Sequence, residues 1–189
     1  MEPGKKEEVA AVRVVTLRAV EATPESFAPF GQVVSAGSDR AKFGPDDAQL
    51  DLSRGIPRFY IMKLENQPLK FSSITHHANP SLVDGASELS GQETQDQDGS
   101  SRRSPCHWEE PVPSRAGHYY LPPDPAEVCA FRVSGLKFLK LHKGTWHAGP
   151  LFRADAMDFY NLELSNTNIV DQTIHRFRKL DGVTFVVED

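Results

Sequence analysis

The apolar residues of this chain occur in short runs, and turn-forming residues interrupt almost every run. In the C-terminal third, such runs cover residues 119–121, 128–133, 136–141, 159–164 and 183–187. Prolines and glycines separate them, as in Pro122-Pro-Asp-Pro125 and Gly149-Pro150. No run repeats at the period of a long helix, and runs of this length are typical of strands. The sequence therefore predicts an all-β, mainly antiparallel fold, either a sandwich or a barrel.

The N-terminal part is predicted to add one short helix to these strands. Thr23 can cap a helix and Pro24 suits its first position, where no N–H is needed. Gly31 can then provide a left-handed exit from the helix. Strands are predicted at residues 12–17, 32–34, 59–62 and 69–75, and a long loop at 36–55.

The length of 189 residues suits a single domain, which we place at 11–189. Residues 1–10 are polar and are expected to form a disordered tail. Residues 85–105 contain almost nothing apolar, so they cannot bury enough surface to offset the entropy of ordering. We therefore expect a disordered polar insertion at 85–105 within the domain.

Charge and composition restrict the partners of this chain. It has 21 Lys and Arg against 26 Asp and Glu, a formal charge of −5, which argues against nucleic acid as a partner. No apolar run is long enough to span a bilayer, and the first residues lack the apolar core of a signal peptide. Cys106 and Cys129 cannot make a disulfide framework by themselves. We expect a cytoplasmic protein that contacts no membrane.

The stretch from Leu136 to Pro150 holds the strongest candidates for chemistry. On a strand, Leu136, Phe138, Lys140 and His142 would share one face, apolar at one end and charged at the other. Such a face fits a barrel wall that runs from a packed base to an open mouth. The turn after it, which begins at Lys143, would present Trp146 as an apolar wall and His147 as a group that titrates near neutral pH. A histidine beside a tryptophan is as often a packing residue, but the neighbouring cations and His142 favour function.

Other titratable residues are weaker candidates. Asp158 and Glu163 lie on opposite faces of one predicted strand, and a single carboxylate there more often orients a histidine or faces solvent. His76 and His77 are adjacent on a strand, so at most one can join a given pocket. The remaining histidines sit in polar surroundings and receive no role: His107, His118 and His175.

Metal and nucleophile chemistry have little support in the sequence. Barrel metal sites often use a His-x-His pair, and this chain has none. We predict no strong metal centre, although a weakly bound divalent ion held by His142, His147 and an acid remains open. Neither Cys106 nor Cys129 has an evident base beside it, and there is no Gly-x-Ser-x-Gly or phosphate-binding glycine signature.

Several segments together resemble one enzyme family. They are Leu141-His-Lys-Gly-Thr-Trp-His147, Pro150-Leu151, Met157-Asp-Phe159, Asn168-Ile-Val-Asp171, residues 25–34 and Ser73-Ile-Thr-His-His77. In this combination the chain resembles the ureidoglycolate lyases, also called ureidoglycolate hydrolases, which have the cupin superfold. The resemblance implies a cupin-like β-barrel or jelly roll and a homodimer. It also implies a reaction in allantoin and purine catabolism, the cleavage of (S)-ureidoglycolate to glyoxylate and urea.

The resemblance also suggests roles for the candidate residues. The reaction removes a hydroxyl proton and protonates the departing nitrogen, which suits histidines near their pKa. We expect His147 as the general acid/base, His142 as its partner or a second acid, and Asp158 as the residue that orients a histidine. Lys140, Lys143 or Arg153 would hold the carboxylate, and Trp146 and His77 are further substrate-binding residues.

The chain departs from the family after His77, where the family continues with a strand pair rich in Gly, Gln and Val. Here Ala-Asn-Pro80 and the polar insertion come instead, which predicts that one hairpin of the barrel is absent. An absent hairpin would leave strand edges unpaired. Two further functions therefore stay open: a cupin-like binding or interaction protein without turnover, and a metal-dependent cupin enzyme such as an isomerase or oxygenase.

Overall fold

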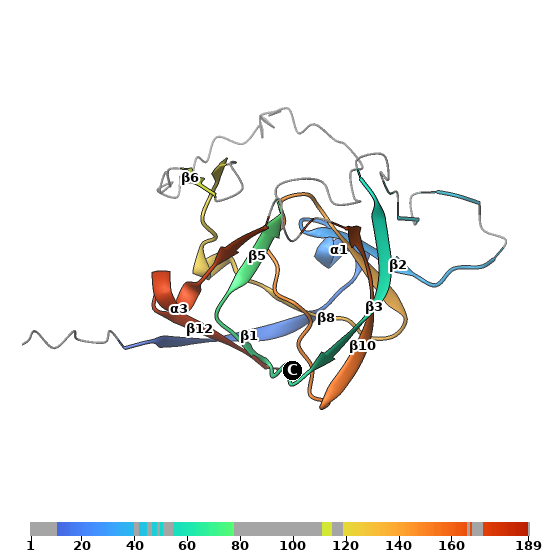
Figure 1. The fold of residues 1–189 in the computed structure, drawn as a ribbon. Helices are drawn as coiled ribbons and strands as arrows, with labels where there is room; N and C mark the ends of the chain where they lie inside the picture. The colour runs from blue at the N-terminus through green and yellow to red at the C-terminus, as the bar shows by residue number, and fades with distance from the viewer. Residues whose placement is uncertain are drawn as a thin grey trace, which may run out of the picture.

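A computed structural model describes residues 11–39, 42–44, 47–48, 50, 55–77, 111–114, 119–165, 167 and 172–188. The tail predicted at 1–10, the polar insertion predicted at 85–105 and the absent hairpin after His77 all lie outside these residues. The fold is all-β and cupin-like, with antiparallel strand pairs and a curled sheet that forms a half-barrel (Figure 1). The predicted fold class is confirmed.

Strands are the predominant secondary structure of the described residues. In chain order they are β1 Arg13–Glu21, β2 Gly31–Ser35, β3 Pro57–Glu65, β4 Lys70–Phe71, β5 Ile74–His77, β6 Val112–Pro113, β7 Tyr119–Tyr120, β8 Ala130–Arg132, β9 Lys137–Leu141, β10 Ala156–Leu164, β11 Gln172–His175 and β12 Val183–Glu188. The helices are short: α1 Pro24–Phe27, the 3-10 helix η1 Pro125–Glu127 and α3 Phe177–Leu180. Of the helices in the described ranges, none is long and apolar enough to cross a membrane.

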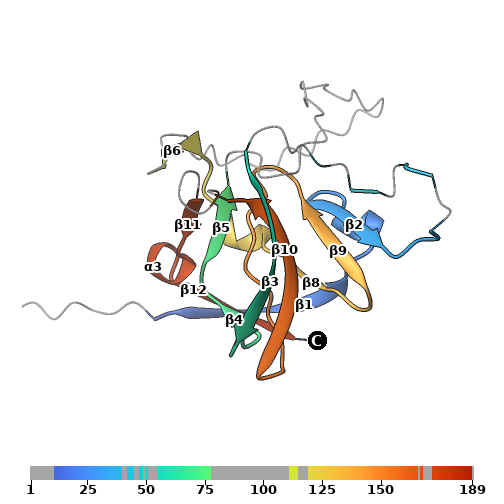
Figure 2. The same ribbon diagram turned by 45° about the vertical axis from the view of Figure 1, so that its right-hand side comes forward.

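The largest sheet has the order β4-β12-β1-β8, and β1 lies in its middle. Strand β1 runs parallel to β12, from Arg13 opposite Val183 to Arg18 opposite Glu188, and parallel to β8 at its other end. The remaining pairs are antiparallel: β3 with β10, β5 with β11, β2 with β9, β4 with β12 and β6 with β7. Figure 1 shows β3 and β10 on the opposite side of the molecule from α3, and Figure 2 shows them at the front.

Two hydrophobic clusters hold these sheets together. The first contains Ile74, Phe177, Val183 and Phe185, and it joins β5, α3 and β12. Phe177 and Phe185 are fully buried, and their rings meet edge to face at 4.9 Å. The second cluster packs α1 against β2 and contains Ala22, Phe27 and Val33. Burial of side chains of this size contributes about 1.5–3 kcal/mol each, so these clusters position the strands.

Helix α1 begins as predicted but ends differently. The Thr23 hydroxyl accepts a hydrogen bond from the Ser26 backbone N–H, and the Ser26 side chain accepts one from the Thr23 N–H, a reciprocal cap. Gly31 is not a left-handed exit, because it is the first residue of β2. A Cβ at Gly31 would overlap the Lys140 carbonyl oxygen and lie 2.9 Å from the Leu141 Cα. Glycine is therefore needed here for close approach of β2 and β9.

Several strand predictions need correction. The run at 69–75 divides into β4 and β5, which pair with different strands, β12 and β11. Strand β11 and helix α3 were not predicted, because the residues of β11 are mostly polar. Leu136, predicted to lie at a packed barrel base, is 88% exposed and precedes β9. The apolar residues that pack inward from β9 are Leu139 and Leu141, beside the second cluster.

A charged cluster around Glu21 ties the end of β1 to the segment that leads into β9. The Glu21 carboxylate accepts hydrogen bonds from Lys137, Arg132 and Ser134. The Lys137 ammonium also donates to the Ala22 carbonyl oxygen, at 2.9 Å. These donors, Lys137 foremost, lower the pKa of Glu21 to about 2, because each one stabilises the ionised carboxylate.

We predict that Gly31→Ala destabilises the fold by about 2 kcal/mol or more, since β2 and β9 must separate to admit the methyl group. Urea unfolding measures this change. Gly37→Ala is the matched control, because a Cβ at Gly37 meets nothing within 4 Å. Equal stability of the two variants would contradict the proposed contact.

Glu21→Gln should change how stability depends on pH. A lowered pKa in the folded state adds stability that is fully present above the unfolded value of 4.5 and is lost as pH falls toward about 2. The wild-type protein should therefore exceed Glu21→Gln in unfolding free energy at pH 6, and the difference should shrink steadily between pH 4.5 and 2. Denaturant unfolding across this range tests it, and a difference independent of pH would be the contrary result.

Candidate functional site

Strand β5 positions the histidines, because it lies between β11 and the segment that contains Trp146 and His147. The Thr75 N–H donates to the His147 carbonyl oxygen at 2.7 Å, and the His147 N–H donates to the Thr75 carbonyl oxygen at 2.8 Å. This reciprocal pair fixes the register of the two segments. Side chains alternate along both, so His77 shares a face with His147, and His76 shares the other face with Trp146.

The face with His77 and His147 forms the imidazole pair, the name used below for these two residues. Their ring centroids are 5.6 Å apart and the ring planes differ by 34°. The His147 Nδ1 lies 3.0 Å from the Thr145 carbonyl oxygen. A carbonyl oxygen only accepts, so Nδ1 carries the proton and the lone pair of the neutral ring is on Nε2.

The environment of His147 keeps its ring neutral. Burial lowers the pKa of His147 below 6.5, because the charged form loses its hydration. The hydrogen bond to the Thr145 carbonyl acts in the opposite direction, and the nearby charge of His77 lowers the pKa further. A neutral imidazole with a fixed tautomer is the form that can take a proton.

The opposite face of β5 packs into the core. The His76 ring is 4.8 Å from the Trp146 ring, and Tyr120 covers Trp146 at 5.6 Å. Trp146, predicted as an apolar wall of the site, packs against the first hydrophobic cluster and so contributes to the core. His175 joins this side of the sheet, with its ring 6.2 Å from Trp146.

His175 corrects a prediction, because it does not lie in polar surroundings. It is 4% exposed, and its ring lies 4.7 Å from Phe177. The His175 Nε2 is 2.8 Å from an Asp181 carboxylate oxygen. The available signal was Phe177 two residues later, which anchors this segment in the core. His107 and His118 lie outside the described residues.

His142 and Lys140, both predicted for the site, occupy different environments. His142 is exposed, its Nε2 lies 3.1 Å from the Ala28 carbonyl oxygen, and its backbone N–H donates to Phe30. Its contacts are thus with the end of α1, whereas His147 pairs with β5. Lys140 is only 8% exposed and sits in β9 opposite Gln32. The structure thus brings His77, rather than His142, next to His147.

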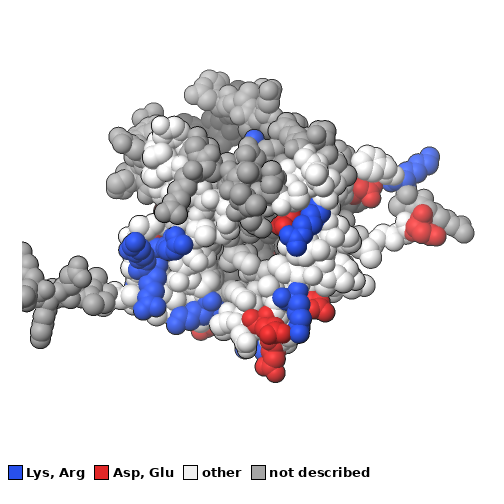
Figure 3. Space-filling view, in the orientation of Figure 1, with Lys and Arg blue, Asp and Glu red and all other residues white. Residues whose placement is uncertain are grey.

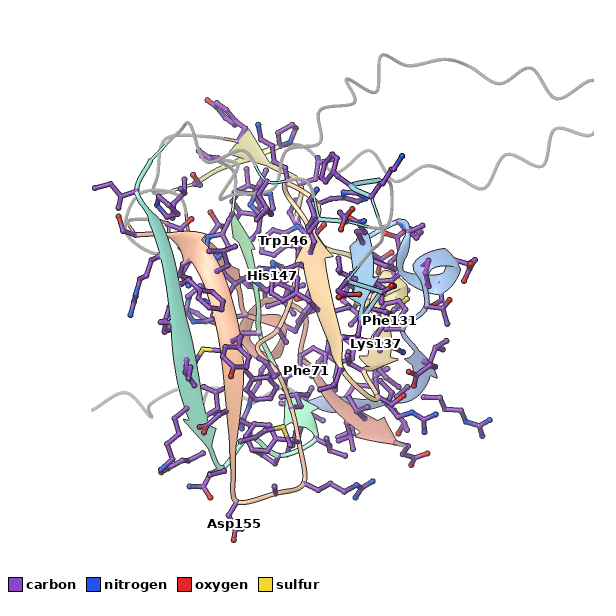
Figure 4. The ribbon with its side chains drawn as sticks, turned by 90° about the vertical axis from the view of Figure 1, so that its right-hand side faces the viewer. Phe71, Phe131, Lys137, Trp146, His147 and Asp155 are labelled. Atoms are coloured by element: carbon purple, nitrogen blue, oxygen red, sulfur yellow. The ribbon has the colours of Figure 1, made fainter. Side chains whose placement is uncertain are left out.

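The remaining predicted site residues are exposed. Lys143 lies in the turn after β9, and Arg153 lies in the segment before β10. Asp158 is in β10 opposite Lys63, on the outward face that also carries Tyr160. Figure 4 labels Trp146 and His147 in the middle of the molecule, far above the β10 end at Asp155.

The sequence prediction missed a polar cluster on the less exposed face of β3 and β10. Glu163 accepts from Asn161 at 3.0 Å and lies 3.4 Å from both the Tyr60 hydroxyl and the Arg58 guanidinium. Asn161 also donates to the Tyr60 oxygen at 3.0 Å. The signal was spacing: Arg58 with Tyr60, and Asn161 with Glu163, are each two residues apart on paired strands.

Metal-binding groups are limited in the described part of the chain. There, no three His, Cys, Asp or Glu side chains come together in a way that could hold a metal ion. The ligand set considered from the sequence, His142 with His147 and an acid, is therefore not assembled by these residues. Cys129 is exposed and its thiol lies 3.5 Å from the Glu127 carbonyl oxygen.

Comparisons with known proteins add no family assignment: no protein-family model matches this chain, and the search of curated proteins found no match.

We predict that His147 titrates below pH 6.5 in NMR spectra of the imidazole protons. His77→Gln should raise the pKa of His147, because it removes a like charge beside the ring. His142→Gln is the control, since His142 contacts α1, and should leave the titration of His147 in place. A His147 pKa that is insensitive to His77→Gln would contradict the contact between the two rings.

Proposed function

We propose that this protein is a lyase of the ureidoglycolate type, which cleaves (S)-ureidoglycolate to glyoxylate and urea. The observation that supports it best is the imidazole pair, with His147 held neutral and its Nε2 able to accept a proton. Support also comes from the resemblance of residues 141–147 and 73–77 to that family. Those two segments are joined by the Thr75–His147 backbone pair.

The chemistry needs one proton to move between two atoms of the substrate. The substrate carbon bears a hydroxyl, a carboxylate and the nitrogen of a urea group. His147 Nε2 takes the hydroxyl proton, the O–H electron pair forms the C=O bond of glyoxylate, and the C–N pair moves to nitrogen. The imidazolium then gives its proton to that nitrogen, so urea leaves neutral and His147 is restored.

His77 replaces His142 as the proposed partner of His147. Its ring lies against that of His147, and its positive charge would oppose protonation of His147. This arrangement keeps the base neutral before reaction and makes the imidazolium a ready proton donor afterwards. His142 is then assigned to the α1 contact, where its ring meets the Ala28 carbonyl.

We assign recognition of the substrate carboxylate to Lys140. Of the three cations predicted for this role, Lys140 is buried, whereas Lys143 and Arg153 are exposed. A buried ammonium attracts a carboxylate more strongly than an exposed one, because less water screens the pair. The family resemblance extends the proposal to a homodimer and to a cytoplasmic enzyme of allantoin breakdown.

Turnover by the purified protein tests the proposed function. (S)-Ureidoglycolate is supplied and glyoxylate is followed over time, with and without a chelator. Turnover that a chelator does not affect supports the histidine mechanism, and chelator-sensitive turnover favours a metal-dependent enzyme instead. If no glyoxylate forms with or without the chelator, the result favours a cupin-like binding protein without turnover.

His147→Gln should lower kcat roughly 10²–10⁴-fold, the usual share of acid–base catalysis. His142→Gln is the matched control, since it removes an imidazole that contacts α1, and should retain most of kcat. In the wild-type enzyme, kcat/KM should fall on acidification only below pH 6.5, because the pKa of His147 is lowered. An equal loss of kcat in the two variants would contradict the role of His147 as the general acid/base.

A further inference from the structure

A second polar feature lies in a different part of the fold, where α3 meets the turn between β4 and β5. An open surface depression of about 460 Å³ is lined by Ser72, Ser73, Arg176, Arg178 and Lys179. We call it the α3 hollow. Among the described residues, its lining supplies three cationic side chains and two hydroxyls, and no carboxylate. These residues are separate from the imidazole pair, so ligand binding at the α3 hollow is independent of the proposed lyase function.

A buried side chain anchors the backbone that carries the cations. Phe177 lies between Arg176 and Arg178 in sequence and is fully buried, with its ring 4.9 Å from that of Phe185. Arg176, Arg178 and Lys179 are exposed around this anchor. The Arg178 backbone N–H also lies 3.5 Å from the Ser72 carbonyl oxygen, which connects the two walls of the hollow. The cationic side chains therefore project from a backbone that the core holds.

Several cations elsewhere in this chain form ion pairs with carboxylates, whereas the described structure shows no such pair for the cations of the α3 hollow. Lys137 and Arg132 pair with Glu21, and Arg58 pairs with Glu163. Within the described ranges, no ion pair joins a carboxylate to Arg176, Arg178 or Lys179. Asp181, two residues after Lys179, directs a carboxylate oxygen to His175 at 2.8 Å.

The surface view agrees with this distribution of charge. Figure 3 shows blue side chains gathered over the position of α3, at the left of the view, although the whole chain carries a formal charge of −5. A concentration of like charges costs free energy through mutual repulsion. An anion bound among them would relieve that repulsion.

We propose that the α3 hollow binds a phosphate monoester group. A guanidinium donates two parallel N–H bonds to a phosphate, and the three positive charges of two arginines and a lysine exceed its double negative charge. The serine hydroxyls can donate to the remaining oxygens. A second open depression, of about 600 Å³, shares Arg178 and Lys179 and extends to Arg13 and Asp181, so the rest of a phosphorylated small molecule has room beside the hollow.

Titration of the isotope-labelled full chain with inorganic phosphate tests the site by NMR. Saturable shifts are expected at residues 72–73 and 176–179, with a Kd on the order of 1 mM, and acetate should bind more weakly. Arg178→Gln should weaken phosphate binding roughly tenfold, because a charge-assisted hydrogen bond is lost. Lys63→Gln removes the same charge from exposed β3 and should leave binding unchanged.

Lys179→Gln provides a second variant, should Arg178→Gln fold poorly, and a similar weakening is expected. Two further probes separate the sources of a phosphate monoester: phenyl phosphate in solution, and phosphatidylcholine vesicles with or without phosphatidic acid. Arginine-dependent binding of phenyl phosphate identifies a soluble ligand, and binding to phosphatidic acid alone identifies a lipid headgroup. Absence of saturable binding to every probe, or equal loss in Lys63→Gln and Arg178→Gln, overturns the proposal.

Discussion

The reciprocal backbone pair between Thr75 and His147 is the contact on which the candidate site depends. It joins a segment that is otherwise outside the named strands to β5, and it sets which side chains share a face. One face then holds two imidazoles, while the other sends Trp146 into the first hydrophobic cluster. Packing of Trp146 on the core side therefore holds His147 on the other side, so stability and chemistry share one short segment.

The polar side chains of this fold have different structural roles. Glu21 gathers three donors at the end of β1 and acts as a tie between elements. Glu163 satisfies a tyrosine, an asparagine and an arginine across β3 and β10. His147, in contrast, has a hydrogen bond to a described residue at one ring nitrogen, where Nδ1 donates to the Thr145 carbonyl. The proposed reactivity of His147 follows from that difference, since a fully satisfied group has no remaining site for a proton.

The sequence predicted the elements whose formation depends on interactions between residues close in sequence. The capped start of α1 and the alternating strands β9 and β10 could be predicted because capping and alternation are readable in sequence. Strand β11 could not, since its buried residues are Thr173 and His175 rather than apolar ones. The site was only partly predictable for the same reason. Spacing along one strand suggested His142, whereas pairing between distant segments places His77 beside His147.

The parallel pairing of β1 with β12 has a consequence for how this protein is made. Arg13 lies opposite Val183, so nearly the whole described chain must be synthesised before β1 gains this neighbour. Contacts between residues so far apart in sequence form slowly, because closing a large loop costs entropy before any bond compensates it. During translation the edge of β1 would stay open to other chains. Aggregation of the nascent chain through this edge therefore competes with folding until β12 has been synthesised.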